Sequence, residues 1–184
     1  MQKFIRTLAA IAIGVSVLSA ANWLTFGGNP QRNGWAKDET ILSTDNIKNL
    51  ELQWKLKLDN EPKGLNALTT PVIVNPVYSN KGAFEYVVVA GSSDNLFVID
   101  ADTGKLAWNK HFTNEAKPPS GYTDPDDYFC PYAINSTPII DTSKGGPTAY
   151  VVSTDGKLHA LNMIDGEDRF PPASSSLLIP KRGA

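Results

Sequence analysis

The stretch LFVIDADTGKLAW, residues 96–108, determines how this sequence is interpreted. Apolar side chains alternate up to Asp100, as in a β-strand, and they resume after Gly104 and lead to Trp108. Asp and Thr side chains bind nearby backbone N–H groups in turns, and a glycine accepts a positive φ without a Cβ clash. The stretch therefore predicts a β-hairpin that turns at Thr103 and Gly104.

The hairpin occurs a second time further along the chain. Residues 150–170, YVVSTDGKLHALNMIDGEDRF, align with residues 87–108, and the turn residues match at an offset of 62. The matched residues are Asn162 with Asp100, Gly166 with Gly104 and Phe170 with Trp108. Internal repetition of this kind is a stronger indication of fold than local propensity.

A second pair of matching segments lies upstream of the two hairpins. The segment LTTPVIVN, which begins at Leu68, matches NSTPIIDT, which begins at Asn135, and their prolines are 67 residues apart. The two matches occur in the same order along the chain. The sequence therefore contains two copies of one structural unit.

Each copy has room for four short strands. We expect them at residues 50–58, 70–75, 86–91 and 95–101 in the first copy, and at residues 105–112, 137–141, 149–154 and 157–163 in the second. Trp54 and Trp108 lie in the opening strands of the two copies. Four antiparallel strands with a tryptophan at a fixed place are typical of a β-propeller blade, and a β-sandwich is the alternative. We predict an all-β fold of two blades, roughly residues 50–101 and 105–163, with the tryptophans packed between neighbouring sheets.

The beginning of the chain has the features of an export signal. Residues 1–21 contain a basic start, an apolar run and small residues before Ala21, the arrangement of a secretory signal peptide. Cleavage is expected after Ala21 or Ala20, and an uncleaved membrane anchor is the alternative. We therefore expect a periplasmic or secreted protein whose globular part is residues 22–170.

The composition of the chain is that of a globular protein. Of its 184 residues 41% are hydrophobic and 20% are charged. Without Lys3 and Arg6 of the signal the 17 basic residues fall to 15 against 19 acidic ones, a formal charge of −4. No basic surface for nucleic acid is expected, and the one cysteine, Cys130, has no partner for an internal disulfide.

The repeat resembles a known family. VIDADTGKLAW, and more weakly ALNMIDGEDRF, resemble the repeat of the pyrroloquinoline-quinone (PQQ) type β-propellers, and WLTFGGNPQRNGW, residues 23–35, resembles the start of mature proteins of that group. The resemblance spans residues 23 to about 170. It implies an eight-bladed ring, which in the dehydrogenase members holds PQQ and Ca²⁺ on the central axis. This chain then supplies about two blades of an incomplete ring, and the unpatterned residues 171–184 indicate truncation or a frameshift.

Two features expected of the dehydrogenases are missing. The resemblance implies an acidic residue before the proline of the first blade's second strand, and NALTTP, residues 66–71, contains none. It also implies adjacent cysteines in the connection that corresponds to residues 112–132, where Cys130 stands alone. We therefore assign no catalytic residue, no metal ligand and no cofactor to this chain alone, although PQQ and calcium are expected in a quinoprotein parent.

The other motifs of the sequence carry little chemistry. His111 and His159 are isolated from each other and from the cysteine, so a zinc site is not predicted, and His159 aligns with Phe97 as an ordinary strand residue. No nucleophile elbow, phosphate loop or dinucleotide fingerprint is present.

Two functions of different class remain open. The parent is either a periplasmic quinoprotein oxidoreductase of alcohols or sugars, or a non-catalytic propeller that serves as a scaffold for protein binding or envelope assembly. The expected partners are the missing blades or a second copy, bound through open blade edges.

Overall fold

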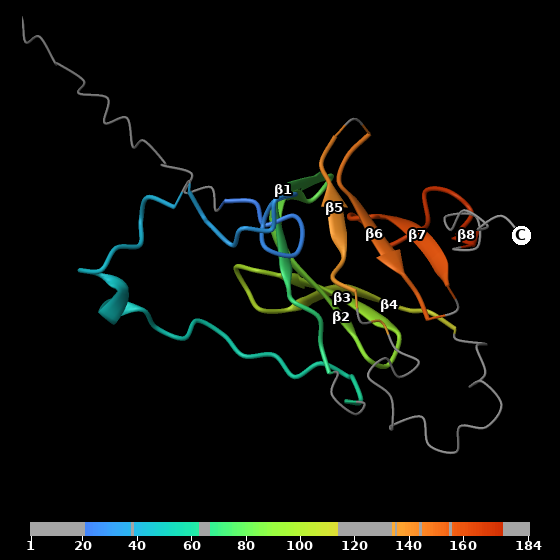
Figure 1. Cartoon of the computed structure of the whole chain (residues 1–184), viewed down its shortest axis with the longest axis horizontal. Coiled ribbons are helices and arrows are strands. Elements are labelled where there is room, and N and C mark those ends of the chain that lie inside the picture. Colours follow the sequence, from blue (N-terminus) through green and yellow to red (C-terminus); the bar gives the residue numbers. More distant parts are fainter. Residues whose placement is uncertain are drawn as a thin grey trace, which may run out of the picture.

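The structure is a computed structural model that describes residues 21–37, 39–62, 67–113, 134, 136–143, 145–154 and 156–174. These residues form two antiparallel sheets of four strands each and one short 3-10 helix, η1 (Ile47–Asn49) (Figure 1). The first sheet has the order β1 (Val72–Ser79), β2 (Gly82–Gly91), β3 (Asn95–Asp100) and β4 (Leu106–His111). The second has the order β5 (Ile139–Asp141), β6 (Thr148–Val152), β7 (Lys157–Asn162) and β8 (Ala173–Ser174).

The predicted division of the strands between the two blades is wrong at β4. The sequence suggested that residues 105–112 open the second unit, but β4 pairs with β3 and completes the first sheet. The reason is the tight turn between them, in which the Gly104 N–H donates to Asp100 O at 2.9 Å and the Asp100 N–H donates to Lys105 O at 2.9 Å. The chain folds directly back, so the sheets comprise residues 72–111 and 139–174.

Residues 50–58, predicted as a strand, form no strand in the described part of the chain. The alternation of their side chains still has a structural consequence, because Trp54, Leu56 and Leu58 pack against one face of the first sheet. The buried residues of that face are Val89, Phe97 and Ile99. The segment therefore covers the side of the first sheet that lies away from the second.

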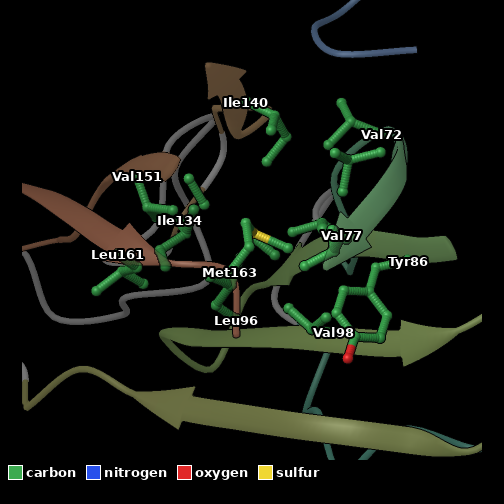
Figure 2. Packing of buried hydrophobic residues seen from close by; sticks show 14 of the residues in the cluster. Val72, Val77, Tyr86, Leu96, Val98, Ile134, Ile140, Val151, Leu161 and Met163 are labelled. Carbon is green, nitrogen blue, oxygen red and sulfur yellow. The ribbon is translucent and has the colours of Figure 1, made fainter. Parts of the chain in front are cut away.

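The main core lies between the two sheets. Alternate residues of β1, β2 and β3 point toward the second sheet, as the period of two in a strand requires. Figure 2 shows these side chains facing those of the second sheet, with Met163 between them. The residues labelled in that figure are Val72, Val77, Tyr86, Leu96, Val98, Ile134, Ile140, Val151, Leu161 and Met163.

A short N-terminal segment connects the first strands of the two sheets. Trp23 exchanges two backbone hydrogen bonds with Ile73 of β1, at 2.9 and 2.8 Å. The next carbonyl, Leu24 O, accepts from the Ile140 N–H of β5 at 2.8 Å. The segment after the predicted signal thus joins the inner edges of both sheets.

The outer face of the second sheet is more open than the equivalent face of the first. Val152 of β6 is 39% exposed, whereas Ala90, at the corresponding place in β2, is fully buried. Phe170, which aligns with Trp108, is 66% exposed. The face of the first sheet that includes Ala90 is covered by the second sheet. No described residues form a further sheet over the equivalent face of the second.

Candidate functional site

The first repeated turn is held by the side chain of Asp100. Its Oδ1 accepts hydrogen bonds from the Thr103 N–H at 2.8 Å and from Thr103 Oγ1 at 2.9 Å. Gly104 has a φ of +66°, a value that an L side chain adopts only at a cost. In this turn Asp100 therefore supplies the acceptor, Thr103 supplies the two donors, and Gly104 supplies the positive φ.

Trp54 packs onto this turn from the segment that precedes the first sheet. The indole Nε1 donates to Ala101 O at 2.7 Å. A Cβ on Gly104 would lie 2.4 Å from Trp54 Cγ, so the ring touches the backbone where a side chain would otherwise stand. Gly104 is therefore required both by its φ and by the tryptophan.

The second turn repeats the arrangement between the two sheets. Trp108, on β4, donates from Nε1 to Met163 O at 3.0 Å, and a Cβ on Gly166 would lie 2.9 Å from its ring. Gly166 has a φ of +76°, and its N–H donates to Asn162 O at 2.8 Å. The structure thus brings Trp54 to the first turn and Trp108 to the second, so each tryptophan joins one unit to the next.

We call the contact between the chain from Trp108 to Phe112 and the second sheet the seam. Besides the tryptophan it contains an ion pair, in which Lys110 Nζ lies 2.9 Å from Asp168 Oδ2. The same ammonium donates to Gly166 O at 3.1 Å. Both side chains are about three-quarters buried, which makes the pair less exposed to screening than a surface pair.

Asp168 extends this ion pair into a polar cluster that the sequence analysis missed. His159 Nδ1 lies 3.1 Å from Asp168 Oδ1, and His159 Nε2 lies 3.1 Å from Ser153 Oγ. Phe112 packs against the imidazole with ring centroids 4.4 Å apart. The alignment of the two copies could have pointed to this cluster, because it places polar residues where the first copy has none. At the offset of 62, Ser153, His159 and Asp168 correspond to Gly91, Phe97 and Leu106.

A cavity of about 500 Å³ lies where β1 and β5 begin. Its wall contains both copies of the threonine-proline region, here represented by Thr70 and Thr137, together with Arg32. The remaining hydroxyls of the wall belong to Thr25, Thr69 and Ser136. The cavity therefore has hydroxyl and guanidinium groups and no carboxylate among its lining residues.

This donor set can be compared with the cofactors of the quinoprotein dehydrogenases. Ca²⁺ takes about six to eight oxygen ligands, with carboxylates prominent among them, so the cavity does not fit this ion. The Arg32 guanidinium and the threonine hydroxyls suit carboxylate groups such as those of PQQ. The lining residues thus suit an organic anion better than a calcium ion.

Other parts of the described chain add no metal or membrane feature. The described residues contain no group of three or more His, Cys, Asp or Glu side chains that could hold a metal. No described helix is long and apolar enough to cross a membrane. Cys130 and residues 1–20 of the predicted signal, which spans residues 1–21, lie outside the described residues.

One carboxyl of the first sheet has a perturbed pKa. Burial, together with the nearby Asp102 carboxylate, raises the pKa of Glu85 above its ordinary value of 4.5. Its charged form is therefore less favourable in the folded than in the unfolded chain, so this group destabilises the fold as pH rises through the folded pKa. Asn75 Nδ2 lies 3.2 Å from Glu85 Oε2, a contact that a glutamine oxygen could keep.

We expect Glu85→Gln to raise the free energy of unfolding at neutral pH by less than about 1 kcal/mol, because the carboxyl is only partly buried. The gain is expected to vanish at about pH 3, where Glu85 is protonated in both states. Urea unfolding of both proteins at the two pH values measures it. A gain of the same size at both values would contradict the electrostatic cause.

No family model matches the sequence, and no curated protein matches it. Among solved structures, quinohemoprotein alcohol dehydrogenase from Comamonas testosteroni aligns with a TM-score of 0.54 and 21% sequence identity, over 82% of this chain. The two sheets therefore share the fold of a pair of β-propeller blades in that enzyme. The alignment covers 19% of the dehydrogenase chain, so this chain corresponds to a small part of that propeller.

Proposed function

We propose that this chain forms two blades of an exported quinoprotein-type β-propeller, and that its parent oxidises alcohols or sugars in the periplasm. The observation that carries the proposal is the similarity of the sheet pair to quinohemoprotein alcohol dehydrogenase. The signal-like residues 1–21 support export. In this proposal PQQ and calcium bind on the axis of the complete ring, and the present chain contributes blade structure.

A second candidate is favoured by the cavity at the strand starts. Its lining includes Arg32 and hydroxyl groups and no carboxylate, the ligand type that is prominent in Ca²⁺ sites. A propeller without a metal site can still present loops and blade edges to other proteins. The alternative function is therefore a non-catalytic scaffold for protein binding or envelope assembly.

Titration with PQQ separates the two candidates. The chain, and a longer chain that carries all blades, are titrated with PQQ with and without Ca²⁺ while tryptophan fluorescence is followed. Saturable, calcium-dependent binding together with dye-linked oxidation of ethanol or glucose by the longer chain supports the oxidoreductase. Absence of both in a folded longer chain overturns it and favours the scaffold.

We also propose that this chain associates with itself when no further blade covers the outer face of the second sheet. The outer face of the second sheet presents Val152, 39% exposed, where the first sheet has a fully buried alanine. Packing of an apolar sheet face contributes about 25 cal/mol per Å² of buried area, so another copy has a favourable place to bind.

Sedimentation velocity tests this association. We expect the weight-average sedimentation coefficient to rise with protein concentration, and Val152→Lys to reduce the rise because the charge would be buried in the contact. Tyr78→Lys serves as the control, since Tyr78 is 70% exposed on the first sheet. A single species at all concentrations would mean that the face does not bind a second copy.

A further inference from the structure

The polar cluster at the seam has the connectivity of a nucleophilic serine site. Ser153, between β6 and β7, is 4% exposed, and His159 is 8% exposed. The hydroxyl, imidazole and carboxylate follow one another at 3.1 Å and 3.1 Å. This order of groups activates serine nucleophiles on unrelated folds, where it is recognised by geometry and not by sequence position.

The partners of the His159 ring determine where its proton lies. An ionised carboxylate only accepts hydrogen bonds, so Nδ1 carries the proton and donates to Asp168. Nε2 is then an acceptor for the Ser153 hydroxyl at 3.1 Å. A second acceptor for that hydroxyl, Lys157 O, is farther away at 3.3 Å. His159 is therefore oriented to take the proton from Ser153 Oγ.

Asp168 is itself held in place from the other sheet. The Lys110 ammonium binds its Oδ2 at 2.9 Å and leaves Oδ1 for the imidazole. Phe112 packs on the same imidazole, which limits its rotation. The orientation of the histidine thus depends on both sheets and is set by the seam.

The cluster opens onto a cavity of about 330 Å³, to whose wall Ser153 and His159 both belong. Phe112 and Pro172 supply apolar surface there, and Lys157 supplies positive charge. Small-molecule sites have volumes of about this size and combine apolar walls with a few polar groups. A short-chain ester fits next to the serine hydroxyl.

The fold does not require polar residues at these positions. In the first copy the equivalents of Ser153, His159 and Asp168 are Gly91, Phe97 and Leu106. Phe97 is buried there in an apolar cluster with Val89 and Ile99. An apolar set at these positions thus supports the same sheet in the first copy, and the second copy alone places the hydroxyl, imidazole and carboxylate together.

The described backbone N–H groups next to Ser153 do not form an oxyanion hole. The N–H groups of Ser153, Thr154 and Gly156 already donate to Lys157 O, Asp94 Oδ1 and Ser153 O respectively. Negative charge on an ester oxygen must therefore be met by the ammonium group of Lys157 on the cavity wall. Flexible ammonium groups are less preorganised than a pair of backbone donors, so turnover is expected to be slow and confined to activated esters.

We propose that Ser153 is the nucleophile of a small ester-hydrolysing site, with His159 as general base and Asp168 as a positioning residue. Ser153 Oγ attacks the ester carbonyl carbon while its proton passes to His159 Nε2. The bond to the leaving oxygen breaks, and the alcohol leaves with that proton. Water then attacks the acyl-serine and gives a proton to His159, and the carboxylic acid leaves as Ser153 Oγ regains its proton.

The test uses the full chain with a fluorophosphonate probe and with 4-nitrophenyl acetate. We expect the probe to label Ser153, located by peptide mass spectrometry, and Ser153→Ala to abolish labelling. His159→Phe, which installs the residue of the first copy, is expected to lower the labelling rate and kcat about a hundredfold. Asp168→Asn is expected to lower kcat at least about tenfold with KM unchanged, as expected of a positioning residue.

Ser143→Ala is the matched control. Ser143 Oγ donates directly to the Asp141 carboxylate, to Oδ2 at 2.9 Å, and not to a histidine that could act as a base. This variant is expected to be labelled and to turn over as the wild type does. Circular dichroism and thermal unfolding of each variant separate loss of reactivity from loss of fold. Equal labelling of Ser153→Ala and wild type, or no labelling of the folded wild type, overturns the proposal. Either result leaves the proposed propeller function unaffected.

Discussion

Replacement of Gly104 by alanine is expected to lower the free energy of unfolding by about 3 kcal/mol. The first cause is the φ of +66°, which costs an L residue about 1–2 kcal/mol. The second is steric, because the new Cβ would lie 2.4 Å from Trp54 Cγ and the ring has to move away. The indole then loses its 2.7 Å hydrogen bond to Ala101 O, at a cost of about 1 kcal/mol.

Gly34→Ala isolates the first cause from the second. Gly34 has nearly the same φ, +67°, and a Cβ there would meet no atom within 4 Å. We expect it to cost about 1 kcal/mol, so that the difference between the two variants measures the packing of Trp54 on the turn. Urea denaturation followed by tryptophan fluorescence gives both values. If the two losses are equal, the tryptophan does not depend on the close approach to Gly104.

The sequence was sufficient to predict the repeated turns because their requirements are local. Asp100 and Thr103 bind their own turn, and Gly104 and Gly166 have the positive φ that the hairpin pattern indicated. The contact of each tryptophan with a glycine turn could be anticipated only in outline, as packing between neighbouring sheets. Its partner atoms depend on how the sheets are placed, which the chain order does not give.

The grouping of strands could not be predicted because alternation has the same form in every strand. Residues 50–58 and 105–112 carry similar patterns, yet only the second segment has a neighbour close in the chain to pair with. The tight turn at Gly104 selects β3 as that neighbour. Pairing thus depends on turn geometry, whereas the apolar pattern determines only which side chains are buried.

The polar cluster escaped prediction for a different reason. Ser153, His159 and Asp168 each look ordinary in sequence. Ser153 follows the end of β6, His159 lies within β7, and Asp168 lies beyond the end of β7. Their proximity follows from the pairing of β6 with β7 and from the bridge between Leu161 and Asp168. Comparison of the two copies shows where polar residues replace apolar ones, but only the structure shows that these positions meet.

Replacement of Trp108 by alanine is expected to separate the two blades energetically. The ring packs on the Gly166 turn and donates to Met163 O at 3.0 Å, so its loss removes apolar contact area and leaves a carbonyl without this donor. Truncation of a buried aromatic residue costs about 3–5 kcal/mol, and because Trp108 is only partly buried we expect a loss near about 3 kcal/mol.

The loss of stability caused by Trp108→Ala is expected to differ between the two sheets. Stability in a repeat fold is approximately a sum of terms within units and between neighbours, and Trp108 belongs to the term between them. We therefore expect the substitution to raise the rate of hydrogen exchange more in β6 and β7 than in β2 and β3. Mass spectrometry of both proteins under native conditions measures the rise. Trp35→Ala, at a position that is 67% exposed, is the control and is expected to change stability by less than about 0.5 kcal/mol. An equal rise of exchange in both sheets would show that the two blades unfold as one unit and that the seam does not divide their stability.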